Sequence, residues 1–347
     1  MIGNTLFMIT MIPFSLATEI PSATSGHAQN PVWSSKGDRL AFEVNDNAGR
    51  IDLFAVDMTG TKFDNIKKVE AKIGGTTFGG LSVVNAAPIW NKRLIIFEHS
   101  RKGVQNRIYS SDLVRPPRPV IQKAQLEGDL SWPTLSTDGK EMFFVSDSKG
   151  AGDIYSFTFI GQKIKHVIKS EGVSEMSPRL NSEGKLLYTR KEGNGEDIYV
   201  STNSDISKWV GGNGDQTRPY WVNNGVVFFS SERGPDIWDL SISTEPSKKK
   251  VLAKNIRLPM RAAPAITPDK NWVVYGVEDP SKSGSIWFTK VDGSKTFSID
   301  TGHVACGDPS VAESNGQILL AYTALPAEGS GWRKLHVVDI TEQLSKH

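Results

Sequence analysis

The sequence has few of the residues that build covalent or metal-bound frameworks. It holds one cysteine, Cys306, in 347 residues, so no intrachain disulfide can form. With only His303 close by in sequence, we expect this thiol to be a buried side chain rather than a nucleophile. The six histidines show no pairing at metal-ligand spacing and no H-E-x-x-H pattern. A disulfide framework and a local zinc motif are therefore excluded.

The chain also lacks a strong excess of positive or negative charge, and it lacks the motifs that bind nucleotides. The net charge is +2 and the pI is about 8.4. The densest basic run, residues 248–250, follows Glu245 and Pro246, which is typical of a solvated loop, so no nucleic-acid partner is predicted. No G-x-S-x-G elbow, P-loop or dinucleotide fingerprint occurs. The glycine-rich stretch 74–80 fits either a flexible insertion or a binding loop.

A short apolar core, Leu6 to Ile12, is the strongest targeting signal. Small residues at Ser15 and Ala17 fit cleavage after Ala17, so residues 1–17 are predicted to be a signal peptide, although no Lys or Arg precedes the core. The core is shorter than the ~20 residues that span a bilayer. We therefore expect a periplasmic or secreted protein with no membrane span.

A proline-anchored unit recurs along the rest of the chain. Four of the six steps between neighbouring anchors are 45 residues long, and the anchors are Pro31, Pro88, Pro133, Pro178, Pro219, Pro264 and Pro309. In four units a glycine stands six residues after the proline, which is hairpin chemistry. Apolar runs of strand length follow, such as "RLAFEV" and "EMFFVS". No amphipathic helix of useful length is present.

This period predicts an all-β fold, a β-propeller formed by residues 18–347 as a single domain. Seven units indicate seven blades of four antiparallel strands. A six-bladed ring is the alternative, because one step is 57 residues long and the last unit lacks room for an outer strand. Residues between Thr18 and Asn30 are expected to supply that strand.

The repeat resembles that of the TolB-like (WD-type) propeller family. The best matches are "NPVWSSKGDRLAF", "WPTLSTDGKEMFF" and "SPRLNSEGKLLY", and the aspartates that open the later strand match at Asp52, Asp153, Asp197 and Asp236. The resemblance implies an exported propeller of bacterial type. In TolB itself, a small α/β domain precedes the propeller. Here the repeats begin at Pro31, so that domain is missing and TolB's partners are not carried over.

Charged residues close to the anchor prolines form the candidate site. In a propeller they are expected to face the mouth of the central channel. They are Asp129, Glu175, Asp215, Arg218, Arg261 and Asp308. Such acids could hold a cation such as calcium or a basic group of a partner. They could raise one another's pKa for acid–base catalysis, or simply bind loop N–H groups. By contrast, Trp33, Trp90 and Trp221 share one repeat position with aliphatic residues and are predicted to lie in the core.

The sequence thus predicts a non-catalytic binding or scaffold module of the bacterial cell envelope. It would act as a monomer without a cofactor and bind a protein or polysaccharide partner at the channel mouth. The alternative is a carbohydrate-active enzyme, a polysaccharide lyase or glycosidase, that uses carboxylates at the same mouth.

Overall fold

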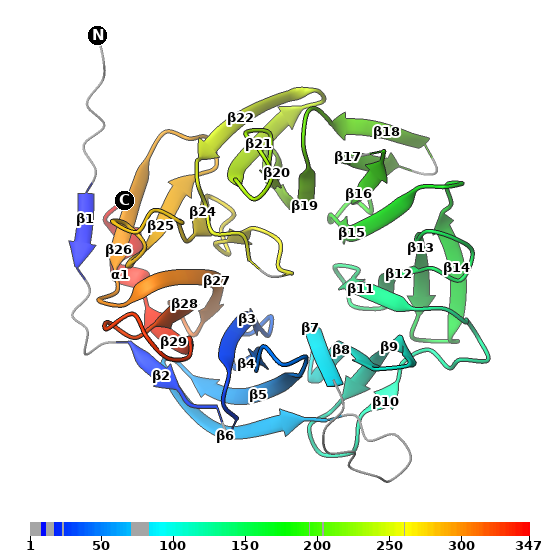
Figure 1. The fold of residues 1–347 in the computed structure, drawn as a ribbon, viewed down its shortest axis with the longest axis horizontal. Helices are drawn as coiled ribbons and strands as arrows, with labels where there is room; N and C mark the ends of the chain where they lie inside the picture. The colour runs from blue at the N-terminus through cyan, green and yellow to red at the C-terminus, as the bar shows by residue number, and fades with distance from the viewer. Residues whose placement is uncertain are drawn as a thin grey trace.

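The fold is described by a computed structural model, which covers residues 8–11, 17–22, 24–70, 83–193, 195–202, 205–259 and 261–347. The elements in these ranges are strands, apart from a five-residue helix, α1 (Thr341–Ser345). Figure 1 shows the sheets set around a common axis, like the spokes of a wheel. The all-β prediction is therefore confirmed.

Most strands belong to four-stranded antiparallel groups. The first sheet joins two such groups through one parallel pairing, between Ile51 and Val84. Its strands are β3 (His27–Trp33), β4 (Arg39–Asn45), β5 (Ile51–Thr59), β6 (Lys62–Val69), β7 (Val83–Asn91), β8 (Leu94–Arg101), β9 (Val104–Ser111) and β10 (Arg118–Pro119).

The next three sheets each contain four strands in sequence order. They are β11 (Leu130–Leu135), β12 (Glu141–Ser146), β13 (Asp153–Thr158) and β14 (Lys163–Ile168); β15 (Ser174–Leu180), β16 (Leu186–Glu192), β17 (Gly195–Thr202) and β18 (Asp205–Val210); and β19 (Gln216–Val222), β20 (Gly225–Ser230), β21 (Asp239–Glu245) and β22 (Lys248–Ala253).

Two further sheets include strands from the N-terminal region. One contains β23 (Ala265–Ile266), β24 (Trp272–Tyr275), β25 (Ser285–Lys290), β26 (Thr296–Asp300) and β1 (Met8–Met11), which pairs in parallel with β26. The other contains β27 (Val304–Ser314), β28 (Gln317–Leu325), β29 (Lys334–Asp339) and β2 (Thr18–Ile20). Strand β1 falls within the predicted signal peptide. The rest of that peptide, apart from Ala17, and the stretch 74–80 lie outside the described residues.

Strand β2 completes the last sheet, as the sequence predicted. It pairs antiparallel with β29, so Glu19 lies opposite His336. Ile20 is 2% exposed and packs in the same cluster as Leu335 and Leu40, which come from opposite ends of the chain. The N-terminal segment therefore ties the first unit to the last one.

The core lies between neighbouring sheets, because the inner strands are apolar on both faces. In β4 the five central residues are all buried. Trp90 of β7 packs with Ala41 and Leu53 of the preceding group, and Trp33 packs with Leu319 of the last sheet. Burying a side chain of this size is worth roughly 1.5–3 kcal/mol. The prediction that these tryptophans serve the core is confirmed, and Cys306 is buried too.

Among the described residues, no helix is long and apolar enough to cross a membrane.

Candidate functional site

The first strand of each unit runs next to the axis and carries a repeated backbone kink. In six of the seven units the residue before the anchor proline has a positive φ, between 45° and 53°; these residues are Asn30, Ala87, Trp132, Ser177, Arg218 and Asp308. The strand register shifts at each of these points. A residue before proline normally avoids helical backbone regions, and a non-glycine residue with positive φ costs about 1–3 kcal/mol. Such a bulge changes which side chains point at the axis.

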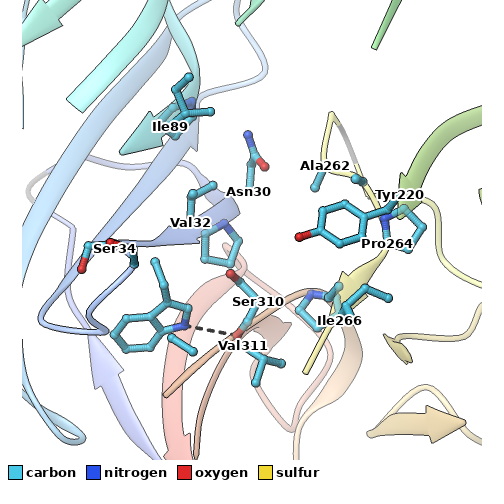
Figure 2. Close-up of a pocket in the computed structure, with 18 of the residues that line it drawn as sticks. Asn30, Val32, Ser34, Ile89, Tyr220, Ala262, Pro264, Ile266, Ser310 and Val311 are labelled. Carbon is cyan, nitrogen blue, oxygen red and sulfur yellow. Dashed lines mark hydrogen bonds between the residues drawn. The ribbon is translucent and has the colours of Figure 1, made fainter. Parts of the chain in front are cut away.

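An axial cavity of about 560 Å³ lies where the seven units converge, and each of them contributes lining residues. Six of the seven residues that directly follow an anchor proline line it; they are Val32, Ile89, Arg179, Tyr220, Ala265 and Ser310. Figure 2 shows Val32, Ile89 and Tyr220 around this space, with the hydroxyl of Tyr220 directed into it. The dashed line in Figure 2 is the hydrogen bond from Trp33 Nε1 to the Ser310 carbonyl, at 3.2 Å.

A buried carboxylate, Glu43, ties the first unit to the second beside this cavity. It stands on β4 opposite Gln29 and is 1% exposed. Its oxygens accept hydrogen bonds from Gln29 Nε2 at 2.8 Å, Asn30 Nδ2 at 2.7 Å and the backbone N–H of Ala87 at 2.8 Å. Burial raises the pKa of Glu43, and these three donors oppose that shift.

Glu98 repeats this arrangement one unit further along the chain. It is 2% exposed, and Oε1 accepts the backbone N–H of Trp132 at 2.8 Å. Oε2 accepts Asn106 Nδ2 at 3.1 Å and pairs with Arg261 Nη1 at 2.6 Å. The Arg261 guanidinium also lies 5.7 Å from the ring centre of Trp132. Both carboxylates therefore hold the kinked backbone of the following unit, and Arg261 reaches them from the segment that leads into β23.

The other side of the cavity carries a cation without a counter-charge. Arg179 Nη1 donates to its neighbour, the Pro178 carbonyl, at 3.1 Å. No carboxylate of the described ranges forms a salt bridge with Arg179. Burial lowers its pKa, and Tyr220 is the one ionisable group that offsets this effect. A guanidinium has five N–H donors, so most of those on Arg179 are free to bind a ligand.

The six predicted site residues separate into two sets. Arg261 and Asp308 both lie close enough to Arg218 for their charges to act on it. Arg218 donates to the Pro259 carbonyl, and burial lowers its pKa to about 10. Asp308 accepts the Thr323 hydroxyl at 2.9 Å. Of the six, only Arg261 is part of the cavity lining.

The remaining three acids are held apart by separate partners. Asp129 is exposed and accepts the backbone N–H of Asn106 at 2.7 Å, and Asp215 accepts that of Glu196 at 3.1 Å. Glu175 is buried, with Oε1 3.5 Å from Arg190 Nε, and burial raises its pKa. Within the described part of the chain, no group of three or more His, Cys, Asp or Glu side chains could hold a metal ion.

Sequence reasoning missed the residues that do meet at the axis. Glu43 and Glu98 each follow a phenylalanine, Glu43 inside an apolar run and Glu98 at the end of one, which are unusual places for a carboxylate. Arg179 and Tyr220 occupy the position after the proline, where other units have small or aliphatic residues or a threonine. In both cases the signal was a departure from the repeat, whereas the prediction followed charge near the proline.

Comparison with known proteins supports the fold and nothing finer. No protein-family model and no curated protein matches the chain. Among solved structures, TolB from Acinetobacter baumannii has a TM-score of 0.53 at 16% identity, over 88% of this chain and 64% of that one. The chain thus spans less than two thirds of that TolB.

Two enzymes have a similar fold. Oligogalacturonate lyase from Vibrio parahaemolyticus has a TM-score of 0.60 at 9% identity, over 94% of both chains. Puromycin hydrolase has a TM-score of 0.61 at 12% identity, over 86% of this chain and 50% of that one. The chain therefore has a TolB-like propeller fold, as its repeat motif predicted. Proteins of this fold include both TolB and enzymes.

Proposed function

We propose that the chain is an exported, non-catalytic propeller that binds a protein partner of the bacterial cell envelope at the axial cavity. The observation that carries this proposal is the state of the two buried carboxylates beside the cavity. Glu43 and Glu98 each accept three hydrogen bonds, one of them from a backbone N–H of the next unit. Carboxylates engaged in this way hold structure, while the cavity offers apolar walls and free donors to a partner.

The proposal includes seven blades and a monomer. Counting the first sheet as two groups and adding β2 to the last sheet gives seven sets of four strands, one for each anchor proline. Strand β1 is an addition to the set β23–β26 and does not change this count.

Export is proposed from the leader-like residues 1–17 together with the TolB-like fold. Cell fractionation tests it: the mature chain should appear in the periplasm or medium, shortened at Ala17. A variant with Leu6 and Phe7 changed to Asp should stay in the cytoplasm. A chain that is exported in both forms, or in neither, contradicts this part of the proposal.

Site-specific photo-crosslinking tests the binding face. A photoreactive residue replaces Glu313, an exposed residue that lines the cavity, or, as the control, Lys165, an exposed residue on the outer strand β14. Each purified chain is irradiated in an envelope extract, and the products are identified by mass spectrometry. We expect one defined adduct from position 313 and none from 165. The same adducts from both positions, or none from either, would contradict the proposal.

A polysaccharide lyase is the second candidate, favoured by the likeness to oligogalacturonate lyase over 94% of both chains. Its test is turnover of oligogalacturonate, followed by ultraviolet absorbance of the unsaturated product, with and without added manganese. Turnover that disappears in the Asp129, Asp215 and Asp308 to Asn variant would replace the binding proposal with an enzymatic one.

A further inference from the structure

The position after each anchor proline forms a ring of side chains at the axis, and this ring is uneven. Five of its seven positions hold the uncharged residues Val32, Ile89, Thr134, Ala265 and Ser310, all of which except Thr134 line the cavity. The other two, Arg179 and Tyr220, are long, polar and adjacent in the order of units. Figure 2 shows the Tyr220 side chain with its hydroxyl directed into the space between the units. The ring therefore places a guanidinium and a phenol in neighbouring units of a cavity whose lining is mixed, with prolines and aliphatic side chains beside polar ones.

The polar corner has unused hydrogen-bond capacity. Arg179 makes one hydrogen bond, to the Pro178 carbonyl, and has no salt bridge within the described ranges. The half-buried Tyr220 hydroxyl has no hydrogen-bond partner in the described structure. By contrast, Arg261 is paired with Glu98. Arg218 also has a single carbonyl acceptor, that of Pro259, but it is not part of the cavity lining. One guanidinium and one hydroxyl thus remain for a ligand.

We propose that Arg179 and Tyr220 bind the terminal carboxylate of a peptide, so that the partner inserts its C-terminal end into the axial cavity. This inference deepens the proposed function and rests on it. A guanidinium offers two parallel N–H groups that match the two oxygens of a carboxylate. The guanidinium suits a single negative charge, and the Tyr220 hydroxyl can donate a further hydrogen bond. The exposed Lys270, between β23 and β24, is a second cation of the cavity lining.

The rest of the cavity fits a peptide end better than a sugar. Its walls include several prolines and aliphatic side chains, among them Pro31, Ile89 and Pro264, which can cover the last apolar side chains of a partner. The volume of about 560 Å³ lies within the range of sites for small ligands and holds a few residues, not a folded domain. The partner would therefore need a free and extended C-terminus.

The test measures retention of a pool of random hexapeptides on the immobilised full chain. One pool has free C-terminal carboxylates, and a second pool has the same sequences amidated. We expect peptides of the free-acid pool to be retained about 10- to 100-fold more strongly, as a charged hydrogen-bonded pair predicts. Arg179→Gln should lose this preference and Arg179→Lys should recover part of it, since lysine keeps the charge but not the paired donors. Tyr220→Phe should weaken retention by a smaller factor.

Arg115→Gln is the matched control, because Arg115 is exposed and pairs with Asp112 outside the cavity; it should behave like the unchanged chain. Circular dichroism melts confirm that each variant is folded. Retention that survives amidation or Arg179→Gln overturns the inference, as does retention of neither pool. If the chain retains trigalacturonate and no peptide, and Arg179→Gln abolishes that retention, then the ligand is a uronate rather than a peptide. The inference of a peptide C-terminus would be wrong. If position 313 still captures a partner while every peptide fails, the proposed function stands and this inference alone is wrong.

Discussion

The two sides of the axial cavity differ in how many hydrogen-bond partners their polar side chains have. On the side of β4 and β8, Glu43 and Glu98 each accept three hydrogen bonds, and Arg261 completes an ion pair with Glu98. On the side of β15 and β19, Arg179 has one carbonyl acceptor, and the Tyr220 hydroxyl points into open space. The first side is internally satisfied, whereas the second has donors to spare.

This difference separates residues that hold the fold from residues that can bind a ligand. Burying a carboxylate without hydrogen-bond donors costs free energy. Here Gln29 and Asn30 donate to Glu43, and Asn106 donates to Glu98. Arg179 is half-buried and has no ion-pair partner within the described ranges, and this partial burial lowers its pKa. A chain tolerates such a cost where the side chain is used in another way.

The largest expected effect comes from breaking the satisfied side. Glu98→Ala would leave Arg261 without its acid and the Trp132 N–H without an acceptor. Leaving the Trp132 N–H unpaired costs about 1–3 kcal/mol, and losing the ion pair, whose Arg261 side chain is 41% exposed, adds about 1 kcal/mol. We therefore expect a loss of about that size in the free energy of unfolding, measured by guanidinium denaturation.

Glu98→Gln is the companion variant, because it keeps an oxygen acceptor while removing the charge. Its free energy of unfolding should fall by about half as much as that of Glu98→Ala. If Glu98→Ala unfolds at the same denaturant concentration as the unchanged chain, the carboxylate does not hold the two units together, and the contrast between the two sides disappears.

A smaller loss of stability is expected when the pH is lowered, because of a histidine on the same side of the cavity. His99 follows Glu98, is 3% exposed, and its Nδ1 lies 2.9 Å from Asn85 Oδ1. Burial, with a contribution from Arg101, lowers its pKa from 6.5 to about 4. Because the folded pKa is depressed, the stability that the neutral ring contributes is present above pH 6.5 and is lost as the pH falls toward 4.

Unfolding curves at about pH 7.5 and about pH 5 check this sign. The unchanged chain should lose about 2 kcal/mol more than His99→Gln over that interval. His336, whose pKa is lowered to about 3, is common to both proteins and cancels in the difference. Equal losses in the two proteins would mean that His99 titrates normally in the folded state.

A third contrast concerns two tryptophans at the same repeat position. Trp90 Nε1 donates to the Val32 carbonyl at 2.9 Å, whereas Trp221 Nε1 is buried with no acceptor in the described structure. Trp90→Phe should therefore cost about 1 kcal/mol more than Trp221→Phe, since one loses a hydrogen bond and the other loses none. Thermal unfolding of the two single variants measures the difference. A larger loss for Trp221→Phe would show that its N–H has a partner.

The repeat explains why the fold could be predicted and the site could not. Prolines near a constant spacing, turn glycines such as Gly37 and apolar runs such as residues 40–44 encode each unit locally. Strand β2 was predicted for the same reason, since the last unit was one strand short. These features depend on contacts within a unit or between neighbouring units, which recur seven times.

The site depends on which way a side chain points after the kink at the proline, and composition does not reveal that kink. Positive φ at Ala87 or Trp132 has no sequence signature, because both residues normally avoid this region. The predicted acids Asp129 and Asp215 lie near the right prolines but bind backbone N–H groups instead. Arg261 lines the axial cavity, and its partner, Glu98, lies 163 residues away in the chain.

The smallest expected effect is also the sharpest test of the comparison. Arg179→Gln removes a half-buried cation that has no ion-pair partner to lose, so the free energy of unfolding should stay unchanged or rise by up to about 1 kcal/mol. Arg261→Gln, on the other side, should lower it by about 2 kcal/mol, because Glu98 would remain as a buried charge without its cation. Denaturation of the two variants under one set of conditions measures both. If Arg179→Gln destabilises the chain as much as Arg261→Gln, then Arg179 is a structural residue with a protein acceptor in solution. The side of β15 and β19 would then have only the Tyr220 hydroxyl to offer a ligand.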